Sequence, residues 1–218
     1  MNDTSKTIIY RDVRRSIIMG HQAPGDRLDI DRLAEQFETS VTPVREAMQM
    51  LSHEGLVTIK PRSGYYVTKI TFKNLRDMLE LRKILELAAI KRAAHRINQT
   101  QIQGLRSVHA GYTGDDDISY DRYTDENRLF HYTLAEISGN QALADTLGHL
   151  LDRLARFMVI RHGGKSQEGT HNRIVSALEI GDVDAARTAL LTDIDASSEA
   201  IMDAILDDEA SNWELGAL

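Results

Sequence analysis

Polar side chains occur at positions where the helical repeat of this chain predicts buried, apolar ones. Asn127 and His131 share one helix face with Leu134 at spacing i, i+4, i+7. His171 begins an apolar stripe on a later helix, and Asp193 lies on a buried face of the last one. Two imidazoles, one carboxylate and one amide oxygen could bind Zn²⁺, Ni²⁺ or Mn²⁺. The alternative is a metal-free network in which Asp193 bonds one histidine and Asn127 the other.

A lone arginine continues another apolar stripe. Leu75, Met78 and Leu79 define the buried face of a long predicted helix, and Arg82 follows Leu75 at i+7. A buried guanidinium needs a partner, because burial of an unpaired charge is costly. The partner could be the carboxylate of a small molecule, held by two parallel hydrogen bonds. It could equally be an internal salt bridge, with Glu86 at i+4 or with Asp193.

Helices position these side chains. From Thr71 onward the chain has no proline and no convincing alternation of period two. A polar break at residues 113–117 and glycine-containing breaks at 139–140, 163–164 and 181–182 separate the apolar-periodic segments. The predicted helices cover residues 72–97, 100–111, 119–138, 141–162, 167–180 and 183–207. Antiparallel helices of this length form an all-α bundle.

The N-terminal part has a different pattern. Residues 32–51 predict two short helices joined by a tight polar break, where Ser40 or Thr42 can cap the second helix and Pro43 suits its first turn. The second helix has one apolar face, while Arg45 and Gln49 point the other way. This is the pattern of a helix-turn-helix that presents a recognition helix to DNA. The apolar face consists of Val44, Ala47, Met48 and Leu51.

A β-hairpin is predicted directly after the recognition helix. Residues 57–60 and 65–68 have strand propensity, and residues 61–64 supply the turn. With a leading helix at about residues 5–19, this makes a winged helix-turn-helix. We expect major-groove contacts from Ser40, Thr42, Arg45 and Gln49. We expect the other contacts, to phosphates or the minor groove, from Arg32, Lys60, Arg62 and the wing turn at Gly64.

Composition and charge limit the class of protein. The 218 residues include no cysteine, which excludes disulfides and thiolate metal sites. No apolar run is long enough for a bilayer and no signal peptide is evident, so we expect a cytoplasmic protein without a membrane partner. Residues 1–70 contain ten Lys and Arg against nine Asp and Glu, whereas the whole chain has a net charge of −7. A dimer would double the weak basic contact with DNA.

Several motifs in order resemble the winged helix of GntR-family bacterial transcription regulators. They are Pro24-Gly25-Asp26-Arg27-Leu28, Leu33-Ala34, Ser40 to Ala47, and Glu54-Gly55-Leu56. The family usually has Arg where this chain has Val41, and that Arg commonly reads a guanine. Val41 could only contact a thymine methyl, so the resemblance implies an altered operator.

The rest of the chain resembles the FadR-type branch with a C-terminal ligand-binding FCD domain. The matching pieces are residues 81–86, 127–131, 138–140, 171–178, and 181–182 followed by 185–186. The resemblance implies a helical bundle that dimerises and binds a small carboxylate effector, often beside a divalent metal. It also implies that Asn127, His131, His171 and Asp193 occupy the metal-ligand positions. The family pattern is usually an acid and three histidines, so Asn127 and Asp193 depart from it.

These observations predict a mainly α protein with two domains. Residues 1–70 form the winged helix-turn-helix, and residues 71–218 form an effector-binding and dimerisation bundle. The predicted function is a homodimeric transcription regulator, with repression relieved by a small organic acid as the expected mode. Arg82 is the expected effector-binding residue. Two alternatives are a metal-dependent hydrolase fused to a DNA-binding domain and an architectural DNA-binding protein without an effector.

Overall fold

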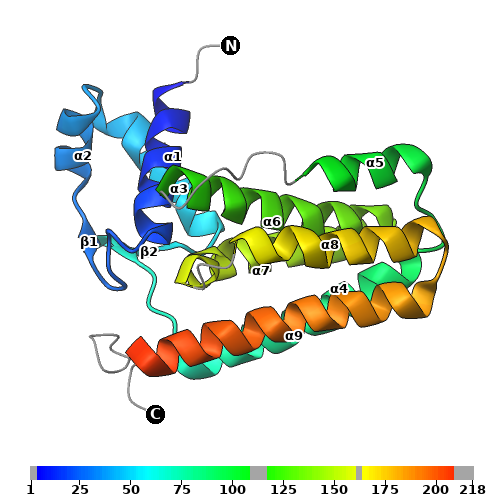
Figure 1. The fold of residues 1–218 in the computed structure, drawn as a ribbon. Helices are drawn as coiled ribbons and strands as arrows, with labels where there is room; N and C mark the ends of the chain where they lie inside the picture. The colour runs from blue at the N-terminus through cyan, green and yellow to red at the C-terminus, as the bar shows by residue number, and fades with distance from the viewer. Residues whose placement is uncertain (1–3, 109–116, 161–163, 209–218) are drawn as a thin grey trace. The chain divides into compact units, whose positions relative to one another are not determined.

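The computed structural model describes residues 4–108, 117–160 and 164–208. The chain divides into two compact units, Met1–Thr71 and Phe72–Leu218. The predicted fold class is confirmed: three helices and a small sheet make the first unit, and the described part of the second is helical (Figure 1). The predicted break at residues 113–117 falls almost entirely outside the described residues, as does Gly163. None of the described helices is long and apolar enough to cross a membrane.

The first unit is a winged helix. Its helices are α1 (Ser5–Ile18), α2 (Ile30–Gln36) and α3 (Val41–His53), and its strands are β1 (Arg27–Leu28), β2 (Val57–Lys60) and β3 (Gly64–Val67). The strands form an antiparallel sheet in the order β1-β3-β2. No strand was predicted at residues 27–28, but Arg27 and Leu28 pair with Tyr66 and Tyr65. A strand this short exists only through its partner.

Local sequence explains where the helices of the first unit begin and end. The Asp29 carboxylate accepts hydrogen bonds from the backbone N–H groups of Asp31 and Arg32, which fixes the start of α2. Of the two capping candidates, Ser40 and Thr42, Ser40 occupies the N-cap position of α3, but its side chain makes no capping hydrogen bond. The chain leaves α3 through Gly55, whose φ of +76° suits glycine.

The second unit is a bundle whose helices agree with the predicted segments to within a few residues. They are α4 (Phe72–Ala93), α5 (Gln99–Ser107), α6 (Asp117–Ile137), α7 (Gln141–Ile160), α8 (Gly164–Glu179) and α9 (Val183–Asp208). The first helix ends four residues earlier than expected, at Ala93. Asn98 then starts α5 with a capping box, in which its side chain bonds Gln101 N–H and the Gln101 side chain bonds Asn98 N–H.

The helices of the bundle surround one main apolar core. Helix α9 lies beside α4 along much of its length (Figure 1) and also packs on α8, while α6 contacts both α4 and α7. The core includes Ile90 from α4, Phe130 and Leu134 from α6, Ile174 from α8 and Leu190 from α9. The four helices α4, α6, α8 and α9 also carry the buried polar residues that the sequence singled out.

Candidate DNA-binding face and buried polar cluster

Helix α3 separates a buried face from an exposed one. Its four predicted apolar positions are fully buried, and they belong to the core of the first unit. Arg45 and Gln49 are exposed, as are Ser40 and Thr42 at the start of the helix and Arg32 on α2. The exposed side chains can donate and accept hydrogen bonds, which is what reading base edges requires.

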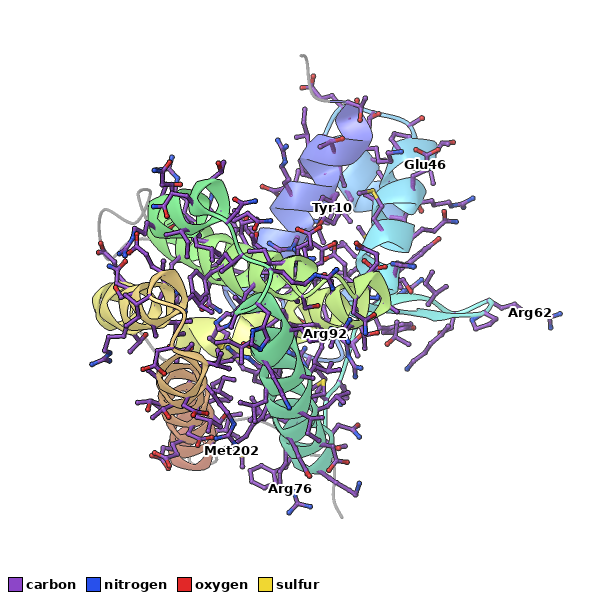
Figure 2. The ribbon with its side chains drawn as sticks, turned by 90° about the vertical axis from the view of Figure 1, so that its right-hand side faces the viewer. Tyr10, Glu46, Arg62, Arg76, Arg92 and Met202 are labelled. Carbon is purple, nitrogen blue, oxygen red and sulfur yellow. The ribbon has the colours of Figure 1, made fainter. Side chains whose placement is uncertain are left out.

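Polar contacts fix α3 against α1. The Tyr10 hydroxyl on α1 donates a short hydrogen bond to a carboxylate oxygen of Glu54, at the end of α3. The buried Arg14 brings its Nε to 3.5 Å from the other oxygen of Glu54. Lys6 and Glu46 add a more exposed ion pair at 3.7 Å (Glu46 is labelled in Figure 2). These contacts therefore hold the candidate recognition helix α3 against α1, and none of them was predicted.

The hairpin of β2 and β3 presents basic side chains at its end. Figure 2 shows Arg62 at the tip, pointing away from the helices of the first unit. Arg62 has a φ of +61°, which is uncommon for a residue with a side chain, and Gly64 has a φ of +124° that favours glycine. Lys60 lies over the Tyr66 ring, with Nζ 4.4 Å from its centroid. Lys60 and Arg62 are both exposed.

Three of the four predicted metal-ligand positions meet in the core of the second unit. His131 of α6, His171 of α8 and Asp193 of α9 each offer a ligand atom within 4.8 Å of the others. Asp193 Oδ2 lies 3.6 Å from His131 Nε2 and 3.7 Å from His171 Nε2. The His171 ring stacks on Phe130, with centroids 3.8 Å apart and planes at 8°. Asn127 is also buried, one turn before His131 on α6.

Glu86 joins this cluster, although the sequence suggested it only as a partner of Arg82. Its Oε1 accepts a hydrogen bond from Arg82 Nε at 2.6 Å. Its Oε2 lies 2.5 Å from His131 Nδ1. Because an ionised carboxylate can only accept, His131 donates through Nδ1. Glu86 thus selects the imidazole nitrogen that holds the proton, a role that carboxylates often play beside metal-bound histidines.

Arg82 is completely buried and has partners at all three guanidinium nitrogens. Besides the Glu86 bond, Nη1 donates to Ser197 Oγ at 3.4 Å and lies 3.9 Å from the Met158 sulfur. Nη2 lies 3.1 Å from His131 Nε2. Of the alternatives that the sequence left open for Arg82, the structure contains the internal salt bridge with Glu86. Effector binding by Arg82 stays a prediction.

Neighbouring groups keep the two carboxylates and the guanidinium of the cluster ionised. Burial raises the pKa of Glu86, but His131 and then Arg82 act more strongly together, and the pKa is lowered. Asp193 behaves in the same way: burial raises its pKa, while His171, His131 and Arg82 bring it below the ordinary value. Burial lowers the pKa of Arg82, but Glu86 and Asp193 raise it above its usual range. The cluster therefore contains two carboxylates and one guanidinium in charged form.

The trio fits a divalent metal ion. Bonds of about 2.0–2.2 Å from Zn²⁺ to nitrogen and oxygen place tetrahedral ligand atoms about 3.3–3.6 Å apart, close to the 3.6 and 3.7 Å between Asp193 Oδ2 and the histidines. Asp193 Oδ2 is buried, and no hydrogen bond reaches it from the described part of the chain. Its other oxygen accepts from Thr170 Oγ1 at 2.8 Å, which orients the carboxylate. Two imidazoles and a carboxylate suit Zn²⁺, Ni²⁺ or Mn²⁺.

Sequence reasoning missed three of the polar residues around the cluster. Thr170 precedes His171, and Ser197 follows Asp193 by one helical turn, so both positions were visible in the sequence. Neither hydroxyl carries a signal of its own, because Ser and Thr are common on any helix face. Tyr123, one turn before Asn127 on α6, is also buried and acts electrostatically on Arg82.

Known proteins resemble the chain along almost its whole length. The model of bacterial regulatory proteins of the gntR family matches residues 6–67, and the FCD domain model matches residues 77–196. The HTH-type transcriptional repressor RspR of Escherichia coli is 31% identical over 211 residues, which cover 94% of this chain and 91% of RspR. The Nta operon transcriptional regulator of Aminobacter aminovorans is 29% identical, over 85% of this chain and 89% of that protein.

Solved structures show the same fold. The E. coli McbR/YncC structure has a TM-score of 0.74 at 19% identity and covers 94% of this chain and 100% of its own. A transcriptional regulator from Rhodococcus has a TM-score of 0.72 at 19% identity. The relatives are transcription regulators rather than enzymes, which removes the support for a hydrolase. The chain belongs to the GntR family of DNA-binding transcription regulators and carries an FCD domain.

Proposed function

We propose that the protein is a homodimeric repressor whose DNA binding is relieved by a small carboxylate. The relative RspR is named a repressor, which supports this sign of regulation. In the first unit, the exposed residues Ser40, Thr42, Arg45 and Gln49 enter the major groove of a short pseudo-palindromic operator. Arg32, Lys60, Arg62 and the turn at Gly64 contact phosphates or the minor groove. The basic side chain at the tip of the hairpin supports this assignment.

The effector site lies at the buried polar cluster. The observation that carries this proposal is the meeting of His131, His171 and Asp193 within 4.8 Å, in the core of a domain family that binds ligands. These residues and Asn127 would hold a divalent ion. A bound ion would supply positive charge that attracts a carboxylate. Arg82, beside the trio, would donate hydrogen bonds to the same carboxylate.

DNA binding by the full chain tests this function. The probe is the DNA upstream of the gene itself, in a fluorescence anisotropy titration against a scrambled duplex of equal length and composition. We expect preference for the upstream DNA, and loss of that preference with one member of a panel of small carboxylates. Equal binding to both duplexes, unchanged by every acid, would support the architectural alternative instead.

Thermal melting tests the effector site independently of DNA binding. The same acids are added to the full chain with Zn²⁺ or with a chelator. A ligand that binds only the native state stabilises it by about 2.7 kcal/mol at a hundredfold excess over its Kd. A shift that disappears with chelator supports a metal-assisted site, and a shift that survives leaves Arg82 as the main anchor. No shift with any acid argues against a carboxylate effector.

A further inference from the structure

Two positively charged groups would need the same lone pair in the buried cluster. His131 donates through Nδ1 to Glu86, at 2.5 Å. Its Nε2 lies 3.1 Å from Arg82 Nη2, and because a guanidinium can only donate, Nε2 carries the lone pair that accepts this bond. The same Nε2 lies 3.6 Å from Asp193 Oδ2, within the group of residues that fits a metal ion. One lone pair cannot accept an N–H and coordinate an ion at the same time.

We infer that Arg82 and a divalent metal ion compete for His131 Nε2, and that Glu86 is the positioning residue for both. The Oε1 of Glu86 holds Arg82 Nε at 2.6 Å, and its Oε2 orients the imidazole. When an ion takes Nε2, the guanidinium loses this contact but keeps Glu86 and Ser197 as partners. Metal loading would therefore release the Nη2 donors of Arg82 for an effector carboxylate. This last step rests on the proposed function.

The charges in the cluster agree with this arrangement. Glu86 and Asp193 are both ionised and buried, and Arg82 supplies the compensating positive charge. A divalent ion would bring positive charge to the same place, so the guanidinium contact at His131 becomes dispensable. Glu86 stays necessary in both states, because it keeps the proton on Nδ1 and the lone pair on Nε2. The inference thus gives Arg82 and Glu86 opposite effects on metal affinity.

The test measures Zn²⁺ affinity of the full chain without effector, by competition with a chromophoric chelator. Arg82→Lys keeps the positive charge and can still pair with Glu86, but a lysine side chain is shorter and lacks the fork that reaches His131. Arg82→Gln removes the charge as well. Glu86→Gln weakens the fixing of the His131 tautomer. Lys83→Gln is the matched control, because Lys83 is adjacent but pairs with Asp195, at 2.7 Å, outside the cluster.

We expect both Arg82 variants to bind Zn²⁺ about tenfold more tightly, as for the removal of one competing hydrogen bond. Glu86→Gln should bind it about 10–100-fold more weakly, and Lys83→Gln should match the wild type. Co²⁺ absorption spectra report whether the same ligands are used. Tighter binding by Arg82→Gln alone would assign the effect to charge and overturn the competition.

Other outcomes overturn the inference in distinguishable ways. Weaker binding by a folded Arg82→Lys would make Arg82 a supporting residue of the metal site. Unchanged affinity in Glu86→Gln would remove Glu86 from its positioning role. Absence of Zn²⁺ binding by the wild type would overturn the inference as a whole, while the proposed DNA-binding function would still be tested by its own titration.

Discussion

Removal of only one partner of the buried ion pair between Arg82 and Glu86 should strongly destabilise the second unit. Both side chains are essentially without solvent exposure, and their atoms approach to 2.6 Å. Removal of one partner from such a pair typically destabilises a protein by about 3–5 kcal/mol, because the other charge is left buried. Arg82→Met and Glu86→Gln should each lower the free energy of unfolding by an amount near this range. Since a domain of this size loses about 2–4 °C per kcal/mol, melting temperatures should fall by about 6–20 °C.

The double variant gives the sharper result. With Arg82→Met and Glu86→Gln combined, neither charge is left unpaired, and the amide oxygen of Gln can still accept the bond from His131 Nδ1. We expect the double variant to be more stable than the sum of the single changes predicts, with a coupling energy of at least about 2 kcal/mol.

Urea unfolding of the full chain, followed by far-ultraviolet circular dichroism in the presence of a chelator, measures all four free energies. The chelator removes any metal, so the cycle reports only the side chains. Exposed Lys73 and Asp77 form an ion pair at 2.7 Å on the same helix and supply the control cycle, for which we expect less than about 1 kcal/mol. If the changes in unfolding free energy for the Arg82 and Glu86 substitutions were additive, the predicted interaction between the two side chains would be refuted.

Three further predictions concern DNA binding and acid stability. Arg45→Ala should weaken operator binding by about 1–3 kcal/mol, or roughly 5–150-fold, whereas Arg76→Ala in the second unit removes the same charge and should leave anisotropy titrations unchanged. Arg62→Ala at the hairpin tip should weaken binding to operator and scrambled DNA alike and reduce the salt slope by about one per winged helix. Asp193 has a lowered pKa, so its contribution to stability is present above its ordinary pKa of about 3.9 and is lost as the pH falls toward the folded value. With a chelator present, the unfolding free energy of Asp193→Asn should therefore fall less steeply with decreasing pH than that of the wild type. An unchanged pH dependence in the acid range would contradict the assignment.

The sequence predicted the fold because the relevant signals are local. Apolar residues at helical spacing located each long helix, and Pro43 with the glycines marked the breaks. The strand at Arg27 and Leu28 was not predictable in the same way, because it depends on pairing with Tyr65 and Tyr66, which are distant in sequence. The missing side-chain cap at Ser40 is likewise a matter of local geometry that residue type does not determine.

The sequence predicted which residues belong to the candidate site but not which of their atoms contact one another. A polar residue on an apolar stripe signals burial, and this signal identified Arg82, Asn127, His131, His171 and Asp193, all of which are buried. Which nitrogen of His131 faces Glu86 and which faces Arg82 depends on how α4 packs on α6. No repeat in the sequence carries that information. The competition between metal and guanidinium could therefore be inferred only from distances between atoms.

The position of the cluster on its helices suggests how a ligand could act on DNA binding. Both Arg82 and Glu86 lie on α4, which begins at Phe72, the first residue after the winged-helix unit. Their partners lie on α6, α7 and α9, so a change in the bonds of Arg82 alters how α4 is held by three other helices. A ligand shifts an equilibrium only by its difference in affinity for two arrangements, typically about 1–3 kcal/mol for coupled sites. Loss or gain of one charge-assisted hydrogen bond in a buried site is of that size. Under the proposed function, a change of partner at Arg82 would therefore be large enough to bias such an equilibrium.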